Sequence, residues 1–161
     1  MKKLLLFLAL FFLSLILQFV LTGWIGKRSA DLFLILTILW SYHRGWKEGI
    51  LAGFFCGLGK DIFFFPLIGI NAFSLSLIAL LTSEVKIRIY QQNVLFFALM
   101  AGILILINTL ILSIYLFLFY RFPFLYTIKS SLYPSFFSTW IISCIIYLSV
   151  ENLTRKFIPQ S

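Results

Sequence analysis

The chain has 161 residues, of which 62% are hydrophobic and only 11% are charged, and its mean hydropathy is +1.08. A soluble domain of this length could not bury so much apolar surface, so the composition excludes one and predicts a membrane-embedded domain. The formal net charge of +8 does not indicate a nucleic-acid-binding protein, because the basic residues lie in small groups between apolar runs and form no long basic stretch.

Six apolar segments follow one another along the chain, and a helix needs about 20 apolar residues to cross a hydrocarbon core about 30 Å thick. We predict an all-α integral membrane protein, a bundle of about six transmembrane helices, with one domain over residues 1–161. The first segment is longer than the usual signal-peptide core and lacks a small-residue cleavage site, so we interpret it as an uncleaved span. The predicted spans are residues 4–22, 29–42, 46–65, 67–83, 94–120 and 132–150.

The polar connections between these spans predict the orientation in the membrane. We interpret the stretch from Glu84 to Asn93 as an aqueous loop and the segment ending near Lys129 as exposed to water. Six spans place both termini on one side. With the N-terminus inside, eight of the 13 lysines and arginines lie in inner segments and five in outer segments. The positive-inside rule therefore favours cytoplasmic N- and C-termini.

A row of glycines in the third predicted span is the most informative pattern. Gly45, Gly49, Gly53 and Gly57 recur at every fourth residue, and Asp61 takes the next place in the row. Residues four apart share one helix face, and missing side chains let another backbone approach closely in lipid. The groove holds either another helix of the same chain or a helix of a partner protein. We expect Gly53→Leu to be severe and Gly53→Ala to be mild by comparison.

Asp61 is costly at membrane depth, by about 2.5–3.5 kcal/mol, so it should lie near the surface or be paired. Lys60 precedes it directly, and neighbouring helical side chains point in different directions. A suitable partner would be Arg28 or Arg121. In the alternative interpretation, the segment from Gly59 to Asp61 ends the helix at the membrane surface.

The residues that follow combine a helix breaker with polar groups. Pro66 and Gly69 predict a break before the fourth span. Asn71 and Ser74 either cap the start of that helix or donate hydrogen bonds to a partner. Asn108 lies deeper, in the fifth span, and we predict a hydrogen bond from it across helices.

The sequence contains no motif typical of a catalytic or metal-binding site. His43 is the one histidine, and no pair of carboxylates is spaced for acid and base catalysis. Cys56 and Cys144 each lie inside an apolar run, where we expect small buried hydrophobic residues. The sequence predicts no enzyme and no catalytic, cofactor-binding or metal site.

The stretch from Asp31 to Leu81, about a third of the chain, resembles the central signature of the MreD family. An acidic residue opens the second span, and a glycine row ends in an acidic residue. A Pro-Leu-x-Gly turn then leads into a helix with small polar residues. The residues that carry these features are Asp31, Gly49, Gly53, Gly57, Asp61, Pro66, Leu67, Gly69, Asn71 and Ser74. The family often has proline where this chain has Ala30.

The resemblance implies a non-catalytic subunit of the bacterial cytoplasmic membrane that binds MreC. Through MreC it would work with the actin-like filament MreB, with RodA and with a class B penicillin-binding protein in lateral peptidoglycan synthesis. The outer surface would contact membrane lipid.

The resemblance also implies a six-helix fold similar to the substrate-binding components of energy-coupling-factor importers, which leaves a small-molecule importer component as the alternative function. Such components often carry an A-x-x-x-A pattern in the first span, where this chain has Ala9 alone. Only Asp61, Asn71 and Asn108 could line a solute pocket.

Overall fold

The computed structural model of the chain describes residues 2–25, 29–64, 69–88, 94–120 and 124–157, with side chains described for 5–24, 29–64, 69–87, 94–119 and 135–151. The described residues form six α-helices and no strand, as the composition predicts. The helices are α1 (Lys2–Ile25), α2 (Leu32–Arg44), α3 (Trp46–Phe64), α4 (Ile70–Arg88), α5 (Val94–Tyr120) and α6 (Phe124–Phe157).

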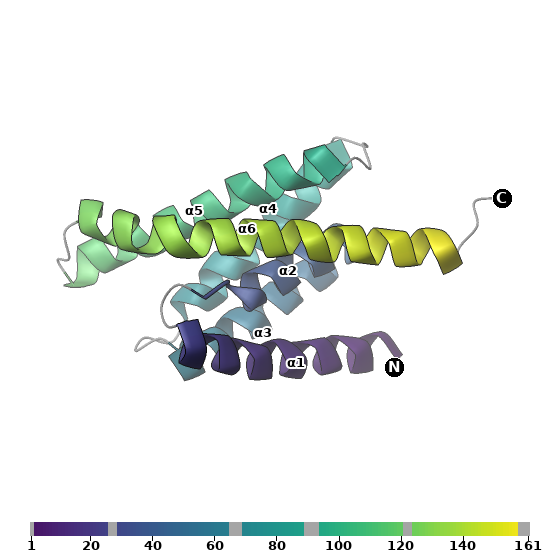
Figure 1. Ribbon diagram of the computed structural model, residues 1–161, viewed down its shortest axis with the longest axis horizontal. Helices are drawn as coiled ribbons and strands as arrows, with labels where there is room; N and C mark the ends of the chain where they lie inside the picture. Colours follow the sequence, from purple (N-terminus) through teal and green to yellow (C-terminus); the bar gives the residue numbers. More distant parts are fainter. Residues whose placement is uncertain (1, 26–28, 65–68, 89–93, 121–123, 158–161) are drawn as a thin grey trace.

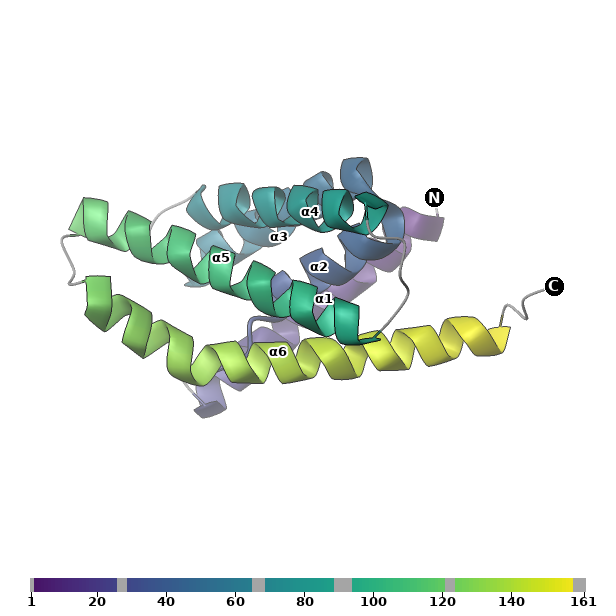
Figure 2. The same ribbon diagram turned by 90° about the horizontal axis from the view of Figure 1, so that it is seen from above.

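The short helix α2 lies inside the bundle, between α1, α3, α4 and α6 (Figures 1 and 2). α3 packs along α4, and α5 packs along α6. α1 lies at the edge, next to α2 (Figure 1). α1 begins and α6 ends at the same end of the bundle (Figures 1 and 2). We refer to this end as the terminal end and to the other as the far end.

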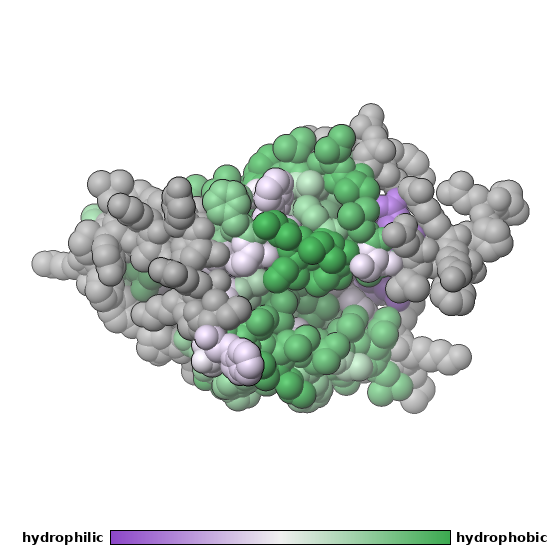
Figure 3. Space-filling model, in the orientation of Figure 1, coloured by the Kyte–Doolittle hydropathy of each residue, from purple (hydrophilic) through white to green (hydrophobic). Residues whose placement is uncertain are grey.

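The core forms around α2, because this helix has neighbours on several sides. Its buried side chains include Phe33, Leu34 and Ile38, which are all less than 2% exposed. On the outside of the bundle, by contrast, large apolar side chains of α1 and α5 are exposed. Apolar side chains cover most of the described surface in Figure 3. A surface of this kind suits contact with lipid.

Three helices are long and apolar enough to cross a membrane, judged by length and composition: Leu5–Trp24, Ile70–Ile87 and Val94–Phe119. Two further apolar segments, Leu32–Arg44 and Ser135–Glu151, are shorter. The other three predicted spans, in α2, α3 and α6, remain a prediction.

α1 and α2 extend beyond the predicted spans by two or three residues, and α4 and α6 extend further. α4 continues to Arg88, so the first part of the stretch interpreted as a loop is helical. α6 covers Phe124–Phe157 instead of residues 132–150. Hydropathy places the ends of a span where charged residues begin, but Glu, Lys and Arg are good helix formers and let a helix continue.

Candidate functional site

The glycines of α3 bring its backbone against the backbone of α4. A Cβ atom added at Gly53 would lie 2.5 Å from the carbonyl oxygen of Leu75. One added at Gly57 would lie under 3.0 Å from backbone atoms of Ala72. Backbone atoms cannot rotate away as side chains can, so neither position has room for even a methyl group. The groove on α3 is filled by a helix of the same chain, and Gly53→Ala is expected to be costly as well as Gly53→Leu, because even a methyl group meets backbone atoms there.

The other two glycines of the row have different surroundings. A Cβ atom at Gly49 would meet the side chain of Ser41, on α2. Gly45 has φ +85 and nothing within 4 Å of an added Cβ atom. Its N–H donates to the carbonyl oxygen of Ser41 at 3.0 Å, which ends α2. The prediction that Gly45 belongs to the packing row is therefore wrong, because α3 begins only at Trp46. A glycine serves there for its backbone conformation.

Asp61 is fully buried and caps α4 from the neighbouring helix. Its carboxylate accepts hydrogen bonds from the N–H groups of Gly69 (2.8 Å), Asn71 (3.1 Å) and Ala72 (3.2 Å). The side-chain amide of Asn71 donates a fourth, at 2.7 Å. The first amides of a helix have no partner within it, and its N-terminus carries a partial positive charge. The cost of burying this carboxylate is offset by those donors.

The interpretation of Gly59 to Asp61 as a helix end is wrong. α3 continues past Asp61 to Phe64, so the carboxylate projects from within the helix onto α4. The two arginines expected as partners, Arg28 and Arg121, lie outside the described residues.

Lys60 points away from Asp61, as the helical geometry predicts, and forms an ion pair with Asp31. Asp31 also caps α2, because its Oδ1 accepts a hydrogen bond from the N–H of Leu34 at 3.2 Å. The N–H of Asp31 donates to Oγ1 of Thr139, on α6, at 3.0 Å. The acidic residue that opens α2 thus connects this helix to α3 and α6 at the far end.

Sequence reasoning missed Gln18 and Thr139. Oε1 of Gln18 accepts a hydrogen bond from the N–H of Leu32 at 2.9 Å, and Nε2 donates to Oγ of Ser29 at 3.4 Å. Gln18 is the one amide in the first apolar run, and an amide in a membrane helix needs a partner, so this signal was present in the sequence. Thr139 offers no such signal, because small hydroxyl residues are frequent in the sixth helix.

Gly69 forms the turn that brings the amides of α4 to Asp61. Its φ of +111 is a conformation that L side chains rarely adopt, and its N–H is one of the donors to the carboxylate. Pro66, the predicted helix breaker, lies outside the described residues.

Asn71 and Ser74 do not cap α4 with their own side chains. Asn71 donates to Asp61, and Oγ of Ser74 donates to Oδ1 of Asn108, on α5, at 2.6 Å. The prediction that Asn108 forms a hydrogen bond across helices is confirmed. Each of these polar side chains therefore joins α4 to a neighbouring helix.

A similar contact joins α2 to α4 nearer the terminal end. The hydroxyl of Ser41 donates to the carbonyl oxygen of Ala79 and lies 2.7 Å from Oγ of Ser83. This is the hydroxyl against which Gly49 packs.

The polar groups described so far form contacts between helices. Within the described ranges, no group of three or more His, Cys, Asp or Glu residues is arranged to hold a metal ion. Cys56 is buried, Cys144 is half-buried, and both are free thiols. The α3–α4 interface, held by glycines and by the Asp61 cap, is the candidate functional site.

Comparison with known proteins gives one result. The model of the MreD family, described as rod shape-determining protein MreD, matches residues 1–157. No curated protein and no solved structure matches the chain. The family match covers the glycine row, the Asp61 cap and nearly all of the remaining chain, and it confirms the resemblance seen in about a third of the sequence. The chain belongs to the MreD family of rod shape-determining proteins.

Proposed function

We propose that this chain is a non-catalytic membrane subunit of the bacterial cell elongation machinery, that it binds MreC, and that it helps to organise lateral peptidoglycan synthesis. The observation that carries the proposal is the family match over residues 1–157. The hydrogen bonds of Asp61 with Asn71 and of Asn108 with Ser74 support a structural role for these residues. MreB, RodA and a class B penicillin-binding protein are the further members of the proposed complex.

The proposed topology has six spans in the bacterial cytoplasmic membrane, with both termini in the cytoplasm. Three helices of spanning length support it, as does the position of the start of α1 and the end of α6 at one end of the bundle (Figure 1). The orientation rests on the excess of eight basic residues over five in the inner segments.

Labelling of reporter cysteines tests the topology. In a background of Cys56→Ala and Cys144→Ala, a cysteine near Lys86 should react from the cytoplasmic side and one near Lys129 from the outside. Labelling of both positions from one side would contradict six spans.

We propose that the α3–α4 interface maintains the fold on which MreC binding depends. Gly53, Gly57, Asp61, Gly69 and Asn71 belong to this interface, whereas Gly49 packs against Ser41 of α2. The support is that α4 occupies the glycine groove, which leaves no space there for a partner helix. MreC would then bind at another surface of the bundle.

Purification of tagged protein from cells tests the proposed function. Tagged wild-type chain should retain MreC through purification, and deletion should convert rod-shaped cells to rounded ones. Gly53→Leu should lower the amount of folded chain in the membrane, whereas the control Gly23→Ala should leave both the amount and MreC retention unchanged. If Gly53→Leu instead leaves the amount normal and loses MreC, the groove is the partner site and the role proposed for the interface is wrong.

The importer component is the alternative, and the same preparation tests it. The three polar residues that could line a solute pocket are engaged with each other or with neighbouring helices. A soluble small molecule that remains bound through purification, together with unchanged cell shape after deletion, would favour the importer.

A further inference from the structure

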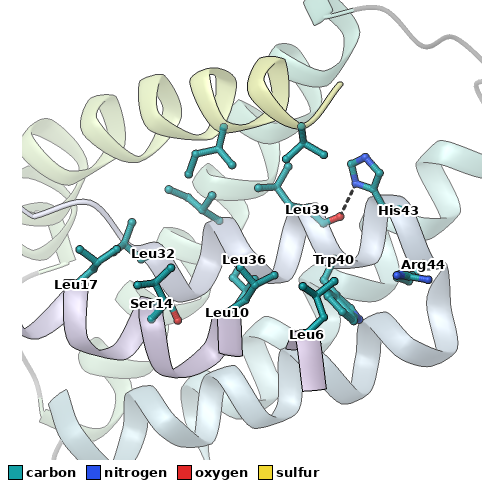
Figure 4. A pocket seen from close by; sticks show the side chains of 14 residues that line it. Leu6, Leu10, Ser14, Leu17, Leu32, Leu36, Leu39, Trp40, His43 and Arg44 are labelled. Carbon is teal, nitrogen blue, oxygen red and sulfur yellow. Dashed lines mark hydrogen bonds between the residues drawn. The ribbon is translucent and has the colours of Figure 1, made fainter. Parts of the chain in front are cut away.

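A long apolar groove lies over α2, between α1 and α6 (Figure 4). Its volume of about 600 Å³ is typical of sites for small organic ligands, which span roughly 300–1,000 Å³. Ten of the 14 residues that line it are aliphatic. Leu36 and Leu39 form part of the floor, Leu10 and Leu13 part of one wall, and Ile146 and Val150 the other wall.

Two basic side chains lie together at one end of the groove. His43 and Arg44 are at the terminal end, opposite to Leu17 and Leu32 (Figure 4). The guanidinium of Arg44 lies 5.5 Å from the centroid of the Trp40 ring, which also lines the groove. Nδ1 of His43 lies 2.9 Å from the carbonyl oxygen of Leu39. The groove is therefore amphipathic, with an aliphatic body and a basic end.

The groove is shorter than the hydrocarbon core of a bilayer is thick. The floor runs from Leu32 to Arg44, which is about 18 Å of helix at 1.5 Å per residue. Half of a hydrocarbon core is about 15 Å deep, whereas a partner helix that crosses the membrane needs about 30 Å. The dimensions fit an acyl chain that ends at a headgroup, and they are short for a transmembrane helix.

We propose that this groove binds an anionic phospholipid of the surrounding bilayer, with an acyl chain along α2 and the phosphate beside Arg44 and His43. The planar guanidinium offers several donors that match phosphate oxygens, and basic pockets between membrane helices attract anionic headgroups. This inference does not depend on the proposed function, because it uses only the groove between α1, α2 and α6.

Native mass spectrometry of the purified full-length chain tests the headgroup. The chain is mixed with phosphatidylglycerol or with phosphatidylcholine, and the fraction that retains lipid is measured. The wild type should retain phosphatidylglycerol preferentially. One basic residue near an anionic headgroup contributes about 1 kcal/mol, so Arg44→Gln should lower retention about fivefold. Lys47→Gln removes a charge at the same end but outside the groove, and it should have no effect.

A second pair of variants tests the acyl chain. Leu13 and Val20 are both 52% exposed on α1, but only Leu13 lines the groove. Leu13→Trp fills the groove and should lower retention of phosphatidylglycerol, whereas Val20→Trp should not. Because both side chains are exposed, both variants should fold, and an unchanged thermal unfolding midpoint verifies this.

Several results would overturn the proposal. They are equal retention of the two lipids, equal effects of Arg44→Gln and Lys47→Gln, and retention unaffected by Leu13→Trp. Displacement of the lipid by inorganic phosphate would identify a phosphate site instead of a lipid site. If Arg44→Gln does not fold, fluorescence quenching by phosphatidylglycerol with brominated acyl chains is measured in place of the retention by that variant. These chains should quench the fluorescence of the wild type more than that of Trp40→Phe, and equal quenching would contradict the proposal.

Discussion

α3 and α1 are both next to α2, and they pack in different ways. α3 has a row of glycines and a buried carboxylate, and its backbone touches the backbone of α4. α1 is rich in Leu and Phe, and it meets its neighbours through side chains such as Phe11, whose ring lies 5.7 Å from that of Phe33. Seven of the 19 residues of α3 are buried, against three of the 20 residues of α1 whose side chains are described.

The difference shows which features hold helices together when lipid is the solvent. A large apolar side chain gains little by leaving lipid for another apolar side chain. Small residues allow close contact along two backbones, and buried polar groups need partners that only another helix can supply. The more apolar helix is therefore the less tightly packed one, and its loose contact leaves the groove between α1 and α6.

The largest expected effect comes from removal of the carboxylate. Asp61→Ala leaves four donors of the α4 N-terminus without their acceptor. Each buried donor without a partner costs roughly 1–3 kcal/mol, so the free energy of unfolding should fall by about 3 kcal/mol or more. Unfolding by SDS in mixed micelles measures it. Asp61→Asn keeps one acceptor oxygen and should lie between the wild type and Asp61→Ala. If all three proteins were equally stable, the Asp61 cap would not stabilise the interface.

The second largest effect is expected from the close contact between the backbones of α3 and α4. Gly57→Ala should lower the free energy of unfolding by about 1–3 kcal/mol, because the new methyl group meets the backbone of Ala72. Gly23 is helical and has nothing within 4 Å of an added Cβ atom, so it provides the matched control. Gly23→Ala should be neutral or stabilise by about 0.5–1 kcal/mol through helix propensity. The same unfolding assay compares the two variants, and a similar result for both would mean that the close contact is unimportant.

A smaller effect is expected from the bond between α4 and α5. Ser74→Ala should cost about 1 kcal/mol, because it removes the hydrogen bond to Asn108. Ser76→Ala is the control, since the hydroxyl of Ser76 bonds to the carbonyl oxygen of Ala72 within its own helix. A double-mutant cycle with Asn108→Ala should detect coupling for Ser74 but not for Ser76. Coupling of the same size for both serines would contradict this assignment.

The smallest effect is expected on α1. Phe12 is 58% exposed on the outer side of this helix, and lipid can replace the contacts of its ring. Phe12→Ala should change the free energy of unfolding by less than about 0.5 kcal/mol in either direction. A loss as large as that for Gly57→Ala would mean that α1 is held as firmly as α3, and the contrast between the two helices would be lost.

The sequence predicts the helices well, but it predicts their ends and the distances between them less well. Apolar runs predict helices because a backbone in lipid must satisfy its own hydrogen bonds. Hydropathy carries no information on where a helix ends outside the apolar layer, so the end of α4 at Arg88 was not predictable from it. The glycine spacing predicts a groove, but the distance between the backbones of α3 and α4 cannot be predicted from it. Only the structure shows that Gly53 lacks room for alanine.

The partner of Asp61 illustrates a second limit of the sequence. A charged residue suggests an oppositely charged residue, and sequence reasoning accordingly considers arginines. The donors found in the structure are backbone amides and one side-chain amide, and backbone amides are the same at every residue except proline. The ion pair of Lys60 with Asp31 was not predictable either, because the two residues are 29 positions apart in the sequence.

The short separation between Asp61 and its donors affects how the chain folds. The carboxylate lies only 8 to 11 residues before the amides that it accepts from. Closing so short a loop costs little conformational entropy, and contacts between near neighbours form quickly. The amides of the α4 N-terminus also have no acceptor in lipid until α3 lies beside them. We therefore expect α3 and α4 to form a helical hairpin early during membrane insertion, before α5 and α6 are added to the bundle.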